Sequence, residues 1–112
     1  MRFLTATFLS GIVLGAIAQM SVAADPALTV IIPRGVQRRT DQVVRFVGAR
    51  LNDADGIFFY EPGFETLEIT AVDANNIDVK IRIAPDCVLG EHTAQVRTKS
   101  GISDYRTFFV GA

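Results

Sequence analysis

The sequence predicts an all-β domain of the sandwich type, and three observations carry this prediction. After residue 24, apolar residues recur at every second position and nowhere at the helical spacing of about 3.6. The alternating runs are short, and clusters of Gly, Pro, Asn and Asp separate them, as turns do. The remaining length suffices for one small domain, so we expect two antiparallel sheets that share a single core.

The first 24 residues have the layout of a secretory signal peptide. Met1 and Arg2 form a positive start, residues 3–18 are mainly apolar, and residues 21–24 supply the small side chains that a signal peptidase needs. The apolar run is shorter than the ~20 residues of a bilayer span. We therefore expect a signal peptide over residues 1–24, cleaved after Ala23 or Ala24, and an exported domain over residues 25–112. The product would be secreted, periplasmic or at the cell surface, with no membrane span after cleavage.

Seven runs of the exported part are predicted to be strands. In chain order they are Leu28–Ile32, Gln42–Val47, Gly56–Tyr60, Leu67–Ala71, Ile77–Ile83, His92–Lys99 and Ile102–Val110. Seven short strands in fewer than ninety residues favour an immunoglobulin-like sandwich over a small barrel.

Each run is bounded by residues that stop strands. Pro33 to Gly35 ends the first run and Gly48 ends the second, while Pro62-Gly63 follows the third. The run Ile77–Ile83 alternates four aliphatic and three charged side chains, and residues 73–76 join it to the preceding run as a hairpin turn.

The last two runs follow the same rules. Pro85-Asp86 closes the fifth run and Gly90 reopens the chain before His92–Lys99. Ser100-Gly101 is a tight-turn signal that leads into Ile102–Val110. Because this final run comes last, we expect it to be a free edge strand that could pair with another chain or a following domain. The alternation predicts the shared core residues Val44, Phe46, Leu67, Ile69, Val79, Ile81, Ala94 and Val96.

Charge and cysteine content exclude several functions. Removal of Arg2 leaves ten basic residues against twelve acidic ones, so the exported part lacks the basic footprint of a nucleic-acid-binding domain. Arg34, Arg38 and Arg39 form a local cluster, which we interpret as a solvated loop. Cys87 is the single cysteine, so the chain contains no internal disulfide, and we expect this thiol to be a small buried hydrophobe.

An ordered set of residues resembles the IPT/TIG family of immunoglobulin-like domains. The set is Pro33-x-Gly35, Val44-x-Phe46-x-Gly48-Ala49-x-Leu51, Pro85-x4-Gly90 opening the run GEHTAQVRT, Ser100-Gly101, and a closing Phe108-x-Val110. It is most similar to the copies near the amino terminus of large exported planctomycete-type bacterial proteins. Two positions depart from the pattern: Val36 and Arg39-Thr40 stand where relatives tend to have glycine, which puts the geometry of that loop in question.

The resemblance implies a non-catalytic sandwich of the E-set type that acts as a structural spacer or protein-interaction module. Its expected partners are neighbouring domains of a larger extracytoplasmic protein or other exported proteins. The alternative is an accessory module that binds cell-surface or extracellular polysaccharide. Neither reading requires a cofactor, a nucleic acid or a membrane span.

The residues themselves offer little for catalysis or metal binding. His92 is the single histidine, and nothing in the sequence fixes a nucleophile beside it. Asp53-Ala54-Asp55-Gly56 resembles half of a calcium loop, but Leu51 and Pro62 occupy positions that would need oxygen ligands. We expect no enzyme and no metal site, with calcium at Asp53 and Asp55 as the weaker alternative.

The stretch GIFFYEPGFE, residues 56–65, is the candidate binding segment. Strand parity sends Ile57 and Phe59 to one side and Phe58 and Tyr60 to the other, so its rings cannot form one platform. We expect one set to pack in the core and the other to offer a narrow binding face. The candidate binding residues are Phe58, Tyr60 and Glu61.

Overall fold

The computed structural model describes residues 25–112, and the predicted signal peptide lies outside these residues. Within this range the chain forms nine strands and no helix: β1 (Ala27–Ile32), β2 (Gly35–Gln37), β3 (Thr40–Ala49), β4 (Ala54–Phe59), β5 (Phe64–Asp73), β6 (Asn76–Ile83), β7 (Gly90–Thr98), β8 (Gly101–Ile102) and β9 (Arg106–Gly111). The part from Asp25 to Ala112 accordingly offers no helix with the length and apolarity that a bilayer crossing demands. The all-β prediction is confirmed.

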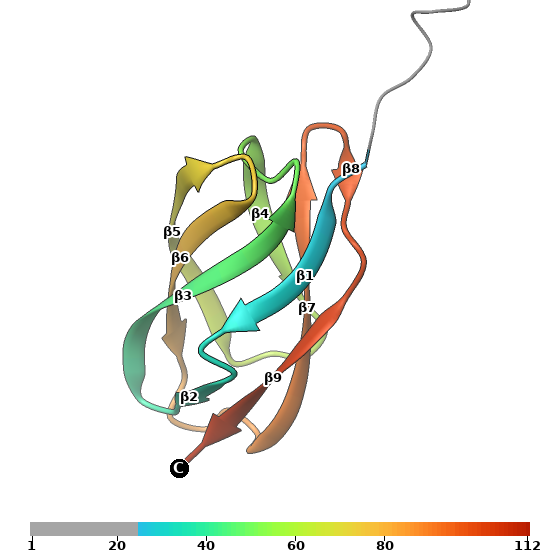
Figure 1. Cartoon of the computed structure of the whole chain (residues 1–112). Coiled ribbons are helices and arrows are strands. Elements are labelled where there is room, and N and C mark those ends of the chain that lie inside the picture. Colours follow the sequence, from blue (N-terminus) through green and yellow to red (C-terminus); the bar gives the residue numbers. More distant parts are fainter. Residues whose placement is uncertain (1–24) are drawn as a thin grey trace, which may run out of the picture.

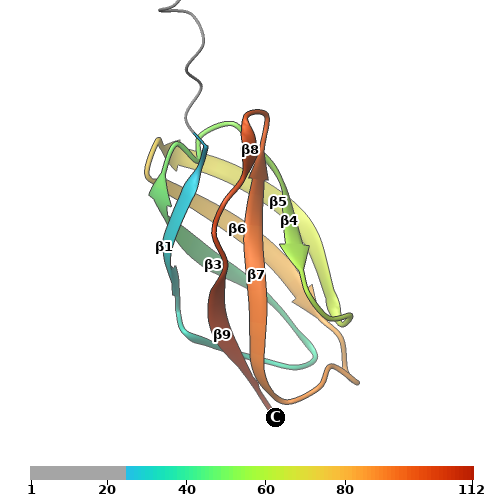
Figure 2. The same ribbon diagram turned by 90° about the vertical axis from the view of Figure 1, so that its right-hand side faces the viewer.

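The strands form two sheets that face each other (Figures 1 and 2). Sheet 1 is antiparallel in the order β1-β3-β6-β5, and sheet 2 has the order β2-β9-β7-β4, with β8 paired to β7. Only β2 breaks the antiparallel pattern, because it runs parallel to β9. The predicted hairpin of residues 67–83 is confirmed as the pair β5 and β6.

Every predicted strand run overlaps an observed strand, but β2 lies in a segment that was expected to be a loop. Its three residues are too few to show a period, and parallel pairing with the distant β9 creates it. The expectation of a free last strand is wrong, since β9 lies between β2 and β7. The run Ile102–Val110 is also interrupted: Ser103 to Tyr105 leave the ladder between β8 and β9.

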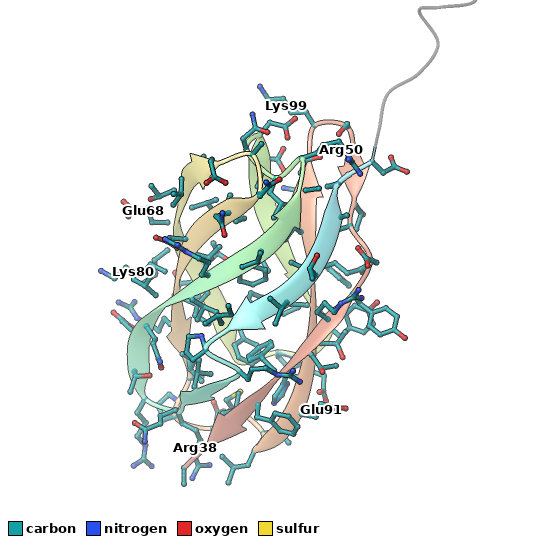
Figure 3. All side chains as sticks on the ribbon, viewed as in Figure 1. Arg38, Arg50, Glu68, Lys80, Glu91 and Lys99 are labelled. Atoms are coloured by element: carbon teal, nitrogen blue, oxygen red, sulfur yellow. The ribbon has the colours of Figure 1, made fainter. Side chains whose placement is uncertain are left out.

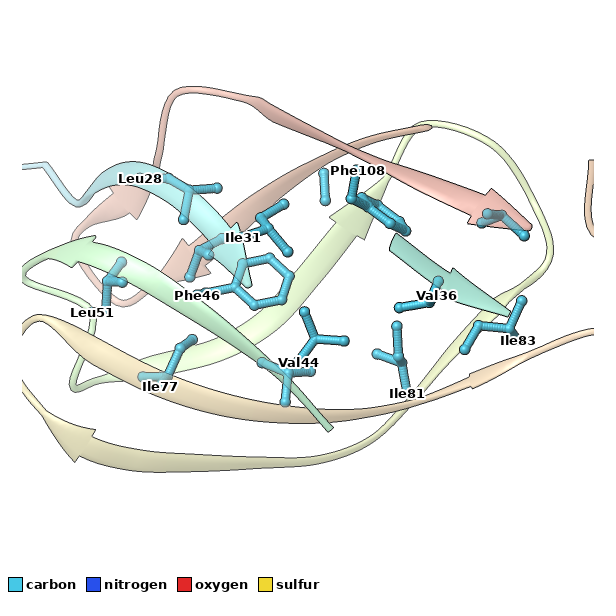
Figure 4. Packing of buried hydrophobic residues seen from close by; sticks show 14 of the residues in the cluster. Leu28, Ile31, Val36, Val44, Phe46, Leu51, Ile77, Ile81, Ile83 and Phe108 are labelled. Atoms are coloured by element: carbon cyan, nitrogen blue, oxygen red, sulfur yellow. The ribbon is translucent and has the colours of Figure 1, made fainter. Parts of the chain in front are cut away.

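The core lies between the sheets and takes side chains from both of them (Figure 4). Six of the eight predicted core residues are fully buried: Val44, Phe46, Val79, Ile81, Ala94 and Val96. Ile69 is partly buried against this cluster. Leu67 is not a core residue, because a bulge between Thr66 and Glu68 makes it the extra residue of β5 and breaks the alternation there.

The outer face of sheet 1 is covered by charged residues that pair across strands. Arg45 lies opposite Asp78 in the β3–β6 ladder and its Nε donates to Asp78 Oδ1 at 2.7 Å. Arg82 pairs with Asp41 in the same way at 2.9 Å. Lys80 and Glu68 project from the same side (Figure 3). Such solvent-exposed pairs contribute little stability, but they keep this face hydrated.

The loop from Ser103 to Tyr105 ties the two sheets together. The Asp104 carboxylate accepts a hydrogen bond from the backbone N–H of Leu28 at 2.8 Å, and this bond is the main cause of the lowered pKa of Asp104. Arg106 Nε donates to the carbonyl oxygen of Thr29 at 3.0 Å. The Ser103 hydroxyl accepts from the backbone N–H of Val96 at 2.9 Å. β1 of sheet 1 is thereby fixed against β7 and β9 of sheet 2.

Gly48 allows the close approach of β1 to β3. A Cβ atom at this position would lie 1.9 Å from the carbonyl oxygen of Ala27, which is backbone and cannot rotate away. The backbone N–H of Gly48 also donates to the carbonyl oxygen of Asn75 at 2.8 Å, so this residue is held from two sides. Glycine is therefore required here for steric reasons.

We predict that Gly48→Ala lowers the free energy of unfolding by about 1–3 kcal/mol, because the added methyl group forces β1 away from β3. Gly35→Ala is the matched control, since its Cβ would lie 3.9 Å from the nearest atom, the carbonyl oxygen of Phe109. Urea unfolding of both variants gives the comparison. Equal stability of the two variants would contradict the close approach.

Candidate functional site

The aromatic stretch is divided between the two sides of sheet 2, as strand parity predicts. Phe59 faces inward, where its ring stacks on Phe64 with centroids 4.6 Å apart and 18° between the planes. Phe64 in turn meets Phe108 edge to face at 5.3 Å. Phe58 and Tyr60 face solvent and are 55% and 51% exposed. The stretch therefore contributes one set of rings to the core and another to the surface.

Three exposed rings form a continuous row on the outer face of sheet 2, the face turned toward the viewer in Figure 2. The Phe58 and Tyr60 centroids are 5.4 Å apart with planes tilted by 58°, and Tyr60 and Tyr105 are 6.5 Å apart with a tilt of 53°. We call Phe58, Tyr60 and Tyr105 the aromatic row. Tyr105 is 58% exposed and completes the row from the loop before β9.

Tyr105 was not among the candidate binding residues. It lies in the segment between β8 and β9 that leaves the ladder, and there Ile102, Asp104 and Tyr105 are exposed while Ser103 is buried, so parity could not have identified it. The contact with Tyr60 depends on the pairing of β7 with β9, which the sequence does not give.

Gln95 fixes the middle of the aromatic row. It lies opposite Phe58 in the β4–β7 ladder, and its Oε1 accepts a hydrogen bond from the Tyr60 hydroxyl at 3.2 Å. Its Nε2 donates to the carbonyl oxygen of Ser103 at 2.8 Å. Both polar atoms of the Gln95 amide are therefore hydrogen-bonded. These bonds fix the position of the Tyr60 ring, which is the middle ring of the row.

A small hollow of about 160 Å³ adjoins the row beside Phe58 and Ile102. The Arg97 side chain lies across Gly56, and a Cβ atom at Gly56 would be 2.8 Å from Nη2 of Arg97.

The calcium alternative involved Asp53 and Asp55. Asp55 is paired with a guanidinium, because Nε of Arg97 donates to Asp55 Oδ1 at 2.9 Å. Between residues 25 and 112 no three His, Cys, Asp or Glu side chains gather as metal ligands.

Glu61 does not join the aromatic row. Its carboxylate instead lies 3.3 Å from Nδ1 of His92, which is 2% exposed and faces the interior. The other ring nitrogen, Nε2, faces the carbonyl oxygen of Val88 and lies 4.0 Å from Cys87 Sγ. The sequence could not have predicted this cluster, because it joins residues from two loops and the start of β7.

Glu61, His92 and Cys87 follow one another in the order carboxylate, imidazole and thiol, as in a catalytic triad. The environment of Cys87, however, disfavours the thiolate form. Burial raises the pKa of Cys87, and the nearby carboxylates of Asp86 and Glu61 raise it further. Because a carbonyl oxygen can only accept, Nε2 of His92 carries its hydrogen toward Val88 and is not available as a base for the thiol. The expectation that Cys87 is a small buried side chain is confirmed.

We predict that native Cys87 reacts with Ellman's reagent only when the protein opens. The rate should be at least about 100-fold below that of an exposed thiol, the factor that a local opening cost of about 3 kcal/mol gives. The matched control is the double variant Cys87→Ser/Val88→Cys, because the side chain at position 88 is 63% exposed. Equal rates for the two proteins would contradict the burial of the thiol.

No family model matches the chain, and neither does any curated protein. Among solved structures, the chain is similar to the twitchin kinase region from C. elegans (Fn31-NL-kin-CRD-Ig26), with 10% sequence identity and a TM-score of 0.40. The match covers 78% of this chain and 15% of that chain. At this TM-score the likeness carries no argument about the type of sandwich or its function.

Proposed function

We propose that this chain is a non-catalytic, exported immunoglobulin-like module that serves as a spacer and binds a partner protein through the aromatic row. The observation that best supports this function is that Phe58, Tyr60 and Tyr105 are each about half exposed and lie in contact on one face. The module would belong to a larger extracytoplasmic protein, so its partner is a neighbouring domain or another exported protein.

The strand order supports the immunoglobulin-like type. Without the short β2 and β8, sheet 1 has the first, second, fifth and fourth strands side by side, and sheet 2 has the seventh, sixth and third. A constant-type immunoglobulin domain has this distribution of seven strands. The family resemblance to IPT/TIG domains adds to this support, and Gly48, one of its residues, has a steric role in the fold.

The contrast between the two outer faces supports the location of the binding surface. The outer face of sheet 1 carries Arg45, Asp78, Arg82 and Asp41 in mutual pairs. The outer face of sheet 2 carries exposed rings, and burial of aromatic side chains supplies much of the energy at the centre of protein interfaces. A partner that covers the row would remove apolar surface from water, and the ion pairs Arg97–Asp55 and Arg106–Asp104 are next to the row.

The side-by-side placement of Phe58 and Tyr60 favours polysaccharide as a second candidate partner. Sugar rings stack best on flat aromatic surfaces, however, and the neighbouring planes here are tilted by 58° and 53°. The Tyr60 hydroxyl is also engaged by Gln95. A protein surface, which can interdigitate with tilted rings, fits this geometry better.

The test is site-specific photocrosslinking. A photoreactive amino acid is incorporated at position 58 or at position 43, and the cells that produce the protein are irradiated. Val43 is 55% exposed, equal to Phe58, and serves as the matched control. We predict a discrete protein adduct from position 58 that is lost in Tyr105→Ser, and no such adduct from position 43. Equal adducts from both positions, or none from position 58, would overturn the proposal.

A panel of insoluble and soluble polysaccharides distinguishes the second candidate. The protein-binding proposal predicts no retention of the purified protein on any of them. Retention that Phe58→Ala abolishes would replace the proposal with carbohydrate binding.

A further inference from the structure

A groove of about 570 Å³ lies on sheet 1, where β3 and β5 begin and β6 ends. Its floor is apolar and consists of Phe64, Ile83, Ala84 and Pro85. The volume is within the range of about 300–1,000 Å³ that is typical of small-molecule sites. The groove is formed by strands other than those that carry the aromatic row, so it is a separate site.

The walls of the groove are held by backbone pairing. Phe64 lies opposite Ile83 in the β5–β6 ladder, and Ala84 donates its N–H to the carbonyl oxygen of Gly63 at 2.9 Å. Gly63 has a φ of 114°, which lets the chain turn into β5 beside the Cys87 side chain. The groove is therefore set by the fold rather than by mobile side chains.

Four charged residues form the rim, and three of them are paired with one another. Arg82 binds both oxygens of Asp41, at 2.9 and 3.0 Å, and its Nη1 lies 3.8 Å from Glu65. The guanidinium of Arg39 makes no ion pair or hydrogen bond with any residue in the range 25–112. The rim thus presents one cation without a partner beside an apolar floor.

The backbone of Arg39 is in a conformation that favours glycine. Its φ is 64°, and its N–H donates to the carbonyl oxygen of Ile83 at 2.9 Å, at the edge of the groove. An L residue is strained in this left-handed region, whereas glycine is not. The sequence left the geometry of this loop in question because it lacks glycine there, and the structure shows that Arg39 adopts the glycine conformation while its side chain lines the groove.

We propose that the groove binds a small ligand with an apolar body and one carboxylate. The carboxylate pairs with Arg39, because a guanidinium matches a carboxylate with two parallel hydrogen bonds. The apolar body covers Phe64, Ala84 and Pro85 and removes their exposed surface from water. Asp41 and Glu65 pair with Arg82, so Arg39 is the cation of the lining that is left to pair with the anion.

The test is a titration of the ¹⁵N-labelled purified protein with three probes that share one alkyl chain: octanoate, octanol and octylamine. Octanoate should shift the amides of Gly63, Phe64, Ile83 and Ala84 in a saturable way. Octanol should bind about tenfold more weakly, the factor expected for one lost charge-assisted hydrogen bond, and protonated octylamine weaker still.

Variants of Arg39 test the role of its charge. Arg39→Gln should lower the affinity for octanoate about tenfold without changing that for octanol, and Arg39→Lys should retain most of it. Arg39→Gly relieves the strain of the left-handed backbone and should show the same loss of octanoate affinity as Arg39→Gln. Arg34→Gln, an exposed arginine outside the groove lining, is the control and should bind octanoate normally.

Three results would overturn the proposal: no saturable shifts at millimolar octanoate, equal affinity for all three head groups, or unchanged octanoate binding by Arg39→Gln. The second result would show a purely apolar groove, and the third would place the anion elsewhere.

Discussion

The contact between the inner faces of the two sheets is the interaction on which the rest of the structure depends. The chain has a single cysteine, so no internal disulfide contributes, and the interior consists of aliphatic and aromatic side chains from both sheets. The polar residues buried there, His92, Thr98 and Ser103, all have hydrogen-bond partners within residues 25–112. The domain is therefore stabilised by the burial of apolar side chains, and no buried polar side chain among residues 25–112 is left without a partner.

This constraint also decides what the outer faces can carry. Because alternate residues of each strand face inward, the remaining residues are free of the packing requirement. On sheet 1 they include charges in cross-strand pairs, and on sheet 2 they include Phe58, Tyr60 and Tyr105. The aromatic row therefore uses positions that the core does not need, and Gln95, which also donates to the backbone oxygen of Ser103, holds Tyr60 in place.

Local alternation was enough to predict the longer strands and most of the core. Val79 and Ile81 were predicted correctly because β6 alternates without a break, while Leu67 was not, because a bulge shifts the parity of β5. Parity also correctly separates the exposed Phe58 and Tyr60 from the inward-facing Phe59. These successes come from period-two geometry, which is a local property of the chain.

The features that the sequence did not predict all depend on long-range pairing. β2 exists because β9 runs beside it, Tyr105 reaches Tyr60 because β7 pairs with β9, and Glu61 contacts His92 across two loops. The groove at Arg39 joins the starts of β3 and β5 to the end of β6. No short sequence motif specifies which distant strands and loops come together. Composition and spacing therefore could not predict all residues of the aromatic row or of the groove.

The central claim is that the aromatic row is kept for binding and not for folding, and the free energy of unfolding tests it most directly. The triple variant Phe58→Ser/Tyr60→Ser/Tyr105→Ser should lose less than about 2 kcal/mol, since its two ring pairs are half exposed and each contributes at the lower end of the range of about 0.5–1.5 kcal/mol. Phe46→Ala, which removes one ring that is 1% exposed, should lose about 3–5 kcal/mol. If the triple variant were as unstable as Phe46→Ala, the row would be part of the core and the account would be wrong.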